Sequence, residues 1–230
     1  MPVPAPLIAP RWRTGALVAI AIWVLVTAWL AVVSYHSAST SFDTWVLRTS
    51  YRHLGSGAAD ALIALSEPAV TIGLIAAVAV AAAILRRWEL AIFAAVGPLV
   101  AVLITEVVLK PIVGRLIGPY VYRGGGLEGA VSGSFPSGHE TGVVSAAMVL
   151  LIAAAQVPAS RAGRLALFDL LVVWTLLAAL GLVRNFFHYA TDTLGAITIT
   201  VAVLLAVALA VDRWFAPLRQ RFGRTPEELI

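Results

Sequence analysis

The sequence contains no cysteine, few charges and only 4 histidines, and each shortage excludes a class of protein. Without cysteine, the chain can form no disulfide, thiolate nucleophile or cysteine-bound metal site. Of its 230 residues, 12% are charged and 60% are hydrophobic, and the mean hydropathy is +0.94. A soluble domain usually carries roughly 25% charged residues. The composition therefore excludes a soluble globular enzyme, a disordered chain and a fibrous protein.

Long hydrophobic runs dominate the sequence instead. A helix needs about 20 mostly apolar residues to span the hydrocarbon core of a bilayer. Six stretches meet or approach this length, and they cover residues 16–35, 70–85, 90–109, 141–157, 165–183 and 193–211. The second is short, but residues 58–65 can extend it. The sequence thus predicts an all-α fold, a bundle of six transmembrane helices that forms a single domain over residues 1–230.

The basic residues predict the orientation of these helices, because cytoplasmic loops carry an excess of Lys and Arg. If the N-terminus is cytoplasmic, ten of the 16 Lys and Arg residues fall at cytoplasmic helix ends. We therefore expect a multi-pass protein of the cytoplasmic (inner) membrane with both termini, including a tail over residues 214–230, in the cytoplasm. Because this orientation explains the net charge of +4, we expect the lipid bilayer as a partner and no nucleic acid.

Two segments then fall on the outer side of the membrane. Residues 41–54 place Phe42 and His53 on one face at helical spacing, which predicts an interfacial amphipathic helix capped by Ser41. Residues 111–137, between the third and fourth spans, are rich in Gly and Pro. Such a composition predicts a long loop, and loops of this length often carry function.

The loop ends in Pro136-Ser137-Gly138-His139, directly before the fourth span. Ser137 is a good helix N-cap, and Gly138 allows a ligand to approach the backbone closely. The free N–H groups at a helix start attract anions, especially phosphate, and His139 in the first turn can give or take a proton. The alternative is a plain helix cap with a histidine at the membrane interface.

A second histidine, His188, precedes the sixth span, and Asp192 follows it by four residues. One helical turn places both side chains on one face. A carboxylate that accepts the proton of one ring nitrogen fixes the tautomer and orients the other nitrogen, which can then act as a nucleophile. The alternative is a structural pair at the membrane surface.

Six cations fall on the outer side, against the trend of the chain, and three of these lie at or after the end of the third span: Lys110, Arg115 and Arg123. Long basic side chains can simply extend to the membrane interface, but an anionic substrate would explain why several gather there. Glu106 lies one turn before Lys110, so an intrahelical ion pair can hold this lysine in place.

Taken together, these residues resemble a known family. The order of Lys110 and Arg115, the PSGH sequence at 136–139, and Arg184, His188 and Asp192 resembles the type 2 phosphatidic acid phosphatase superfamily. Its members are integral membrane lipid phosphatases related to vanadium haloperoxidases. The resemblance covers roughly residues 100–200, and the six-span layout agrees outside them.

The resemblance implies hydrolysis in two steps without a metal or cofactor. His188 would attack phosphorus and form a phosphohistidine, Asp192 would orient it, and His139 would protonate the leaving oxygen. Fixed cations can stabilise the phosphoryl group in place of a metal. The implied phosphate ligands are Lys110, Arg115, Arg184, Ser137 and the Gly138 N–H, and Arg123 is a further candidate.

Two positions depart from the family pattern. In the first motif the Lys is usually followed by six residues and then by Arg-Pro. In this chain the position of that Arg, seven residues after Lys110, is Ile117. The third motif usually has an Arg six residues before its His, where this chain has Leu182. Its arginine is Arg184, four residues before His188. On a helix, this shift turns a side chain by about 200°, so either the backbone is irregular there or Arg184 reaches in from another side.

We therefore expect a membrane lipid phosphatase with its site at the outer membrane face. Polyprenyl diphosphate is slightly favoured as the substrate, and phosphatidic acid or phosphatidylglycerophosphate fits almost equally well. The alternatives are a phosphotransferase that uses the same phosphohistidine, an inactive lipid-phosphate binder, and a transporter that uses its acidic residues as an ion path. The sequence carries no signal for the oligomeric state.

Overall fold

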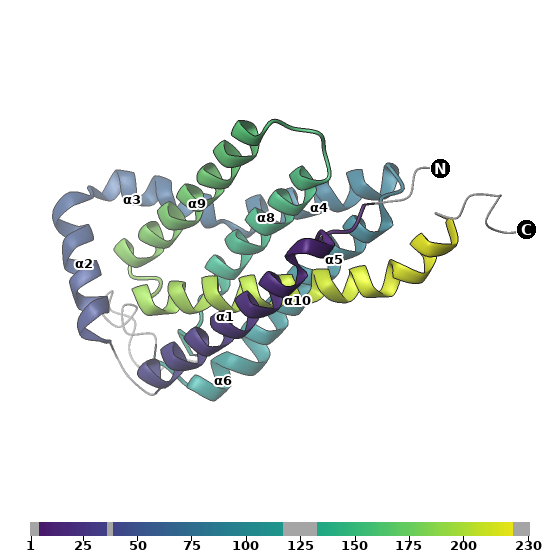
Figure 1. The fold of residues 1–230 in the computed structure, drawn as a ribbon. Helices are drawn as coiled ribbons and strands as arrows, with labels where there is room; N and C mark the ends of the chain where they lie inside the picture. The colour runs from purple at the N-terminus through teal and green to yellow at the C-terminus, as the bar shows by residue number, and fades with distance from the viewer. Residues whose placement is uncertain (1–4, 36–38, 117–132, 223–230) are drawn as a thin grey trace, which may run out of the picture.

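The structure, a computed structural model, describes residues 5–35, 39–116 and 133–222. Within these ranges the regular secondary structure is entirely helical. In chain order (Figure 1) the elements are η1 (Pro10–Trp12), α1 (Arg13–Ser34), α2 (Ser41–His53), α3 (Ser56–Ile63), η2 (Ala64–Ser66), α4 (Pro68–Ile84), α5 (Trp88–Leu103), η3 (Ile104–Leu109), α6 (Lys110–Val113), α8 (Gly138–Ala155), α9 (Arg161–Arg184) and α10 (Ala190–Phe222).

Six helical segments in the described part of the chain are long and apolar enough to cross a membrane. They cover Pro10–Ser34, Ser56–Ile84, Trp88–Val113, Gly138–Ala155, Arg161–Arg184 and Ala190–Pro217. These segments match the six predicted spans, and the second is indeed extended, because α3 and η2 continue into α4. The prediction of an all-α, six-helix, multi-pass membrane protein is confirmed.

The bundle is organised around α10, which packs against α1, α5 and α8. Apolar side chains fill the contact, most of them small or branched, and the fully buried ones include Phe93 and Ala94 of α5, Val149 of α8, and Leu204 and Ala208 of α10. Small residues let the backbones approach closely, which is how helices associate within a membrane. This packing holds α8 and α10, the helices that begin near the two site histidines, side by side.

One end of the bundle carries α2, and Figure 1 shows the start of α1 and the end of α10 at the opposite end. We call the former the α2 end. The predicted helix over residues 41–54 is present, but its N-cap is Thr40 rather than Ser41. Thr40 accepts a hydrogen bond from the N–H of Asp43, and the carboxylate of Asp43 accepts one from the N–H of Thr40. This reciprocal capping box explains why the helix begins one position earlier.

The third span is irregular as it approaches the α2 end. Pro98 lies inside α5, and η3 is a π-helix that leads into the short α6. The span ends at Gly114, whose φ of 57° lies in the left-handed region that glycine adopts without strain. The π-helix widens the turn that contains Glu106 and sets the direction of Lys110, which follows it.

The last helix is longer than predicted. Residues 214–222 continue α10 to Phe222, although the sequence predicted a tail from residue 214. Asp212 is buried near this end, and its carboxylate accepts hydrogen bonds of 2.8 and 2.9 Å from the N–H groups of Leu7 and Ile8. A buried carboxylate needs such donors, so Asp212 also fixes the segment before α1 against α10.

Candidate functional site

A pocket of about 570 Å³ opens at the α2 end between α4, the third span and α8. Its polar lining includes both predicted histidines, His139 and His188, with Lys110. Apolar side chains continue the lining along the spans, and Val102 lies eight residues, about two helical turns, before Lys110. Ile72 of α4 and Val102 are exposed. The pocket thus joins a polar end to an apolar, membrane-facing wall.

His139 is placed by the start of α8. As predicted, Ser137 is the N-cap of this helix, and its hydroxyl accepts a hydrogen bond of 3.2 Å from the N–H of Glu140. The ring of His139 meets the ring of Phe187 edge to face, with 6.1 Å between centroids. The ring of His188 lies at the same centroid distance, 6.1 Å. The two histidines, 49 positions apart in the sequence, therefore face the same small volume.

His188 is oriented through one ring nitrogen. Its Nδ1 lies 3.1 Å from the backbone oxygen of Ser134 and 3.6 Å from Oδ2 of Asp192. Both neighbours are acceptors, so they favour a proton on Nδ1 and leave the lone pair on Nε2. Asp192 lies beside His188, as predicted, but at 3.6 Å it accepts no hydrogen bond from Nδ1, and the acceptor within hydrogen-bond distance is the carbonyl of Ser134.

Asp192 is fully buried and accepts hydrogen bonds at both oxygens. Oδ2 accepts from the hydroxyl of Ser134 and, at 2.9 Å, from the N–H of Tyr189. Oδ1 accepts from Nη1 of Arg115 at 2.6 Å. A carboxylate held from both sides cannot rotate, so Asp192 presents a fixed charge beside His188.

Lys110 and Glu106 form the ion pair that their spacing predicted, with 2.7 Å between Nζ and Oε1. Both residues line the pocket. Gly138 lies against this pair, because a Cβ atom at this position would overlap Oε1 of Glu106. The absence of a side chain at Gly138 thus allows the start of α8 and the end of the third span to meet over the pocket.

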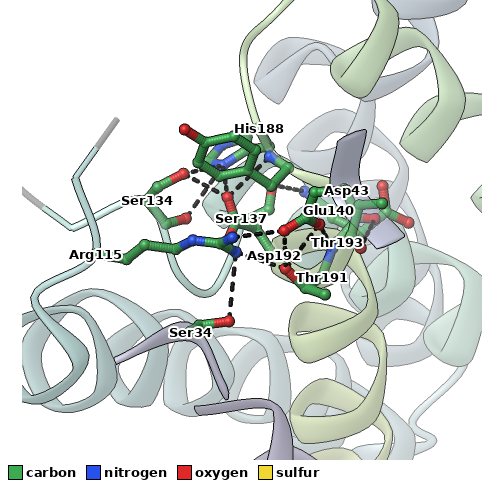
Figure 2. A network of polar contacts seen from close by, with 12 residues as sticks. Ser34, Asp43, Arg115, Ser134, Ser137, Glu140, His188, Thr191, Asp192 and Thr193 are labelled. Atoms are coloured by element: carbon green, nitrogen blue, oxygen red, sulfur yellow. Dashed lines mark hydrogen bonds and ion pairs between the residues drawn. The ribbon is translucent and has the colours of Figure 1, made fainter. Parts of the chain in front are cut away.

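Arg115 does not line the pocket. Its side chain is fully buried, and Figure 2 shows its guanidinium between Ser34, Thr191 and Asp192. Nη2 donates to Oδ2 of Asp43 at 2.6 Å. The expectation that Arg115 holds a phosphate is not met in this arrangement, since its two Nη atoms already face two carboxylates.

Arg184 also lies outside the pocket. Helix α9 ends at this residue, and Phe186 takes a left-handed φ of 61°, so the backbone before His188 is irregular. The Nε of Arg184 donates to the backbone oxygen of Leu54 at 3.1 Å, and its guanidinium carbon lies 3.5 Å from the ring centre of Tyr51. This arginine connects α9 to α2, and the expectation that it binds phosphate is not met here either.

The remaining predicted ligands differ in position. Gly138 lines the pocket, whereas Ser137 is fully buried in the helix cap. The Ser137 hydroxyl accepts a hydrogen bond there, so its own hydrogen can still be donated. Arg123 lies outside the described residues. The sequence interpretation missed Asp43 and Ser134. The Thr40-x-x-Asp43 capping box marks Asp43 only as a helix start, and Ser134 lies in a Gly-rich loop where no pattern distinguishes it.

The protein is thus a multi-pass membrane protein in which two histidines, a lysine and the start of a helix surround one pocket. The model of the PAP2 superfamily matches residues 88–216, more than half of the chain, so this protein belongs to the PAP2 superfamily, as its motifs predicted. Members of this superfamily are generally phosphatases. Searches of curated proteins and of solved structures found no match.

Proposed function

We propose that this protein hydrolyses a membrane lipid phosphate or diphosphate through a phosphohistidine, without a metal. The observation that carries the proposal is the 6.1 Å separation of the His139 and His188 rings in one pocket with Lys110. Two imidazoles at this distance can both contact one phosphoryl group that binds in the pocket. Membership of a superfamily of phosphatases supports the same proposal.

In the first step, the Nε2 lone pair of His188 attacks phosphorus and the bond from phosphorus to the leaving oxygen breaks. His139, as imidazolium, gives its proton to that oxygen. In the second step, His139 takes a proton from water, whose oxygen attacks phosphorus, and the P–N bond breaks to release phosphate and restore His188. Lys110 and the N–H groups at the start of α8 stabilise the phosphoryl oxygens.

The pocket supports a lipid as the substrate. Its polar part lies where the spans end, and its apolar wall includes exposed Ile72 and Val102 of two neighbouring spans. A headgroup phosphate fits the first part, and a hydrocarbon chain fits the second without leaving the bilayer. Polyprenyl diphosphate is our first candidate, followed by phosphatidic acid and phosphatidylglycerophosphate.

The test is phosphate release from each lipid in detergent with EDTA present, for the parent chain and His188→Ala. We expect release by the parent and none by the variant, and a phosphoryl group on His188 when the reaction is quenched and mapped by mass spectrometry. His53→Ala is the matched control, because His53 is exposed on α2 and does not line the pocket. Release that requires a divalent metal, or that persists in His188→Ala, would contradict the mechanism.

An inactive lipid-phosphate binder is the second candidate, favoured by the positions of Arg115 and Arg184 outside the pocket. Binding of the lipid phosphate with no release and no phosphohistidine would support it. The same preparation separates hydrolysis from phosphotransfer when an alcohol acceptor is added and the products are compared.

We also propose that the α2 end faces away from the cytoplasm in the cytoplasmic (inner) membrane. The absence of native cysteine makes this simple to test. Single cysteines at Arg48, on α2, and at Arg161, at the start of α9, should differ in reaction with a membrane-impermeant maleimide in whole cells. We expect labelling at position 48 only, and the opposite pattern would reverse the orientation.

A further inference from the structure

A buried cluster of three charges lies beside the pocket. Arg115 is placed between two carboxylates, with 2.6 Å from Nη1 to Oδ1 of Asp192 and 2.6 Å from Nη2 to Oδ2 of Asp43. The side chains of all three are at most 1% exposed. The cluster carries one positive and two negative charges, so the arginine is the group that allows both carboxylates to remain ionised away from water.

Each carboxylate is fixed by a different element. Asp43, in the first turn of α2, also accepts hydrogen bonds from the N–H and the hydroxyl of Thr191 at 2.8 and 2.9 Å. Thr191 lies directly before Asp192, in the first turn of α10. Helix α2 thus contacts the start of α10 at the position that carries Asp192, and Arg115 fills the space between them (Figure 2).

This placement assigns Arg115 a task other than phosphate binding. The hydrogen bond from Arg115 occupies Oδ1 of Asp192, and Oδ2 is the oxygen that lies 3.6 Å from Nδ1 of His188. The arginine therefore determines which way the carboxylate faces and how much of its negative charge reaches the imidazole. The ring of Tyr189, 4.2 Å from the guanidinium carbon, covers the arginine further.

We propose that Arg115 is a positioning residue that acts through Asp192 on His188, and that Asp43 of α2 holds Arg115 in this task. The inference rests on the proposed function, in which His188 is the nucleophile. If Asp43 has this task, helix α2 contributes to the protonation of His188, although α2 precedes the residues matched by the family model.

The two outer members of the cluster have opposite effects on His188. Without the arginine charge, the negative charges of Asp192 and Asp43 act on the imidazole uncompensated, so His188 takes a proton at higher pH. Without the Asp43 charge, Arg115 neutralises Asp192 more completely, so His188 takes a proton at lower pH. At the effective dielectric constant of protein sites, each change should move the midpoint by about 0.5 to 1.5 pH units.

Other charged groups near His188 stay the same in these variants. His139 faces it from α8, and Lys110 and Glu106 share the pocket from the third span. Glu67 lies between the pocket-lining residues Ser66 and Pro68. If the His188 midpoint moves in opposite directions in the Arg115 and Asp43 variants, the cause is therefore the charge cluster and not these other groups.

The experiment compares Arg115→Gln, Asp43→Asn and the double variant in the full-length chain. One readout is kcat and KM for the lipid phosphate across pH. The other needs no turnover: diethyl pyrocarbonate modifies neutral imidazole, and mass spectrometry of the peptide with His188 gives the modified fraction at each pH. Arg48→Gln, at an exposed position of α2, is the matched control.

We expect Arg115→Gln to lower kcat about 10- to 100-fold, because a small displacement of a reacting group costs up to about 100-fold in rate, with KM changed less than about threefold. Its modification midpoint should move up, that of Asp43→Asn should move down, and the double variant should return toward the parent. The double variant should also be more active than Arg115→Gln, because the second change removes a buried charge that the first leaves unpaired.

A phosphate ligand would behave differently. A large rise in KM for Arg115→Gln, with an unmoved midpoint in both single variants, would overturn the inference. If Arg115→Gln fails to fold, Asp43→Asn alone still decides, since an unmoved midpoint in this variant contradicts the proposal. Lack of phosphate release by the parent would overturn the proposed function, while the modification midpoints would still test the link from Asp43 and Arg115 to His188.

Discussion

The imidazole rings of His139 and His188 lie 6.1 Å apart, centroid to centroid, at the end of the bundle that carries α2. Each is placed by a separate device, the Ser137 cap of α8 for the first and the acceptors at Nδ1 for the second. Because neither ring depends on the other for its position, a substitution at one histidine should leave the other in place. The predictions below follow from this fixed geometry and from the residues around it.

Lys110 supplies the positive charge that lines the described pocket, so Lys110→Met should weaken binding of the phosphate. We expect KM to rise about tenfold or more, corresponding to at least about 1.4 kcal/mol, while Lys110→Arg retains part of the binding. Steady-state kinetics with the lipid phosphate measure this. Arg52→Met, at an exposed position of α2, is the control, and an equal effect there would show that general surface charge rather than Lys110 attracts the substrate.

Gly138→Ala should disturb the contact between the start of α8 and the third span, because the new Cβ would overlap the carboxylate of Glu106. Displacement of Glu106 also displaces Lys110, so kcat/KM should fall about 10- to 100-fold. Gly73→Ala is the matched control, since a Cβ there has no neighbour within 4 Å in the described structure. Unchanged kinetics in Gly138→Ala would mean that the ion pair can move at no cost.

Arg184→Ala should affect stability more than substrate binding. The variant loses the hydrogen bond to Leu54 and the stacking on Tyr51, which together should lower the free energy of unfolding by about 1–3 kcal/mol. Thermal unfolding in detergent checks this, and Arg184→Lys should recover only part, because an ammonium does not stack as a planar guanidinium does. A large rise in KM without loss of stability would return Arg184 to the phosphate site.

We expect the folded protein to lose stability in acid when Asp43 takes up a proton. Burial opposes its ionisation, but the N–H groups of Thr40 and Thr191 and the charge of Arg115 together hold the pKa of Asp43 below its ordinary value. The unfolded chain therefore binds this proton first, and stability rises with pH through the window between the two pKa values. The contribution should be complete above about pH 5 and should disappear as the pH falls through and below about 4.

The measurement is the unfolding temperature in detergent as a function of pH for the parent and Asp43→Asn. The parent should lose more stability than the variant between about pH 5 and the acid limit. Parallel curves for the two chains would show that the ionisation of Asp43 does not contribute to folding.

Replacement of Glu140 by an apolar residue should stabilise the folded protein. The side chain is fully buried in the first turn of α8, and neither carboxyl oxygen has a hydrogen-bond partner among the described residues. An unpaired buried polar group costs about 1–3 kcal/mol, so Glu140→Leu should raise the unfolding temperature, whereas Glu140→Gln should gain less. A strongly destabilised Glu140→Leu would show that this carboxyl has a favourable contact in the folded chain.

The fold and the centre of the site could be predicted from local signals. Six apolar runs determined the spans, and Ser137 and Gly138 marked a helix start. The four-residue spacing of His188 and Asp192 predicted that the two lie close together, although His188 lies before the start of α10 at Ala190 and not on a helical turn with Asp192. The partners of the arginines could not be predicted in this way. Arg115 pairs with Asp43 across 72 positions, and Arg184 bonds Leu54 across 130. A positive charge near a phosphate motif looks the same in the sequence whether it faces a ligand or a buried carboxylate.

Asp43 and Ser34 precede residue 88, where the family match begins, yet both contact Arg115. A fragment limited to the matched residues would keep the two imidazoles, Arg115 and Asp192 but would lack Asp43, the second carboxylate that contacts Arg115. The cluster is therefore larger than the region that the family model matches. A chimera that joins the matched region to a foreign first span and outer helix must supply a carboxylate in the place of Asp43 to reproduce it.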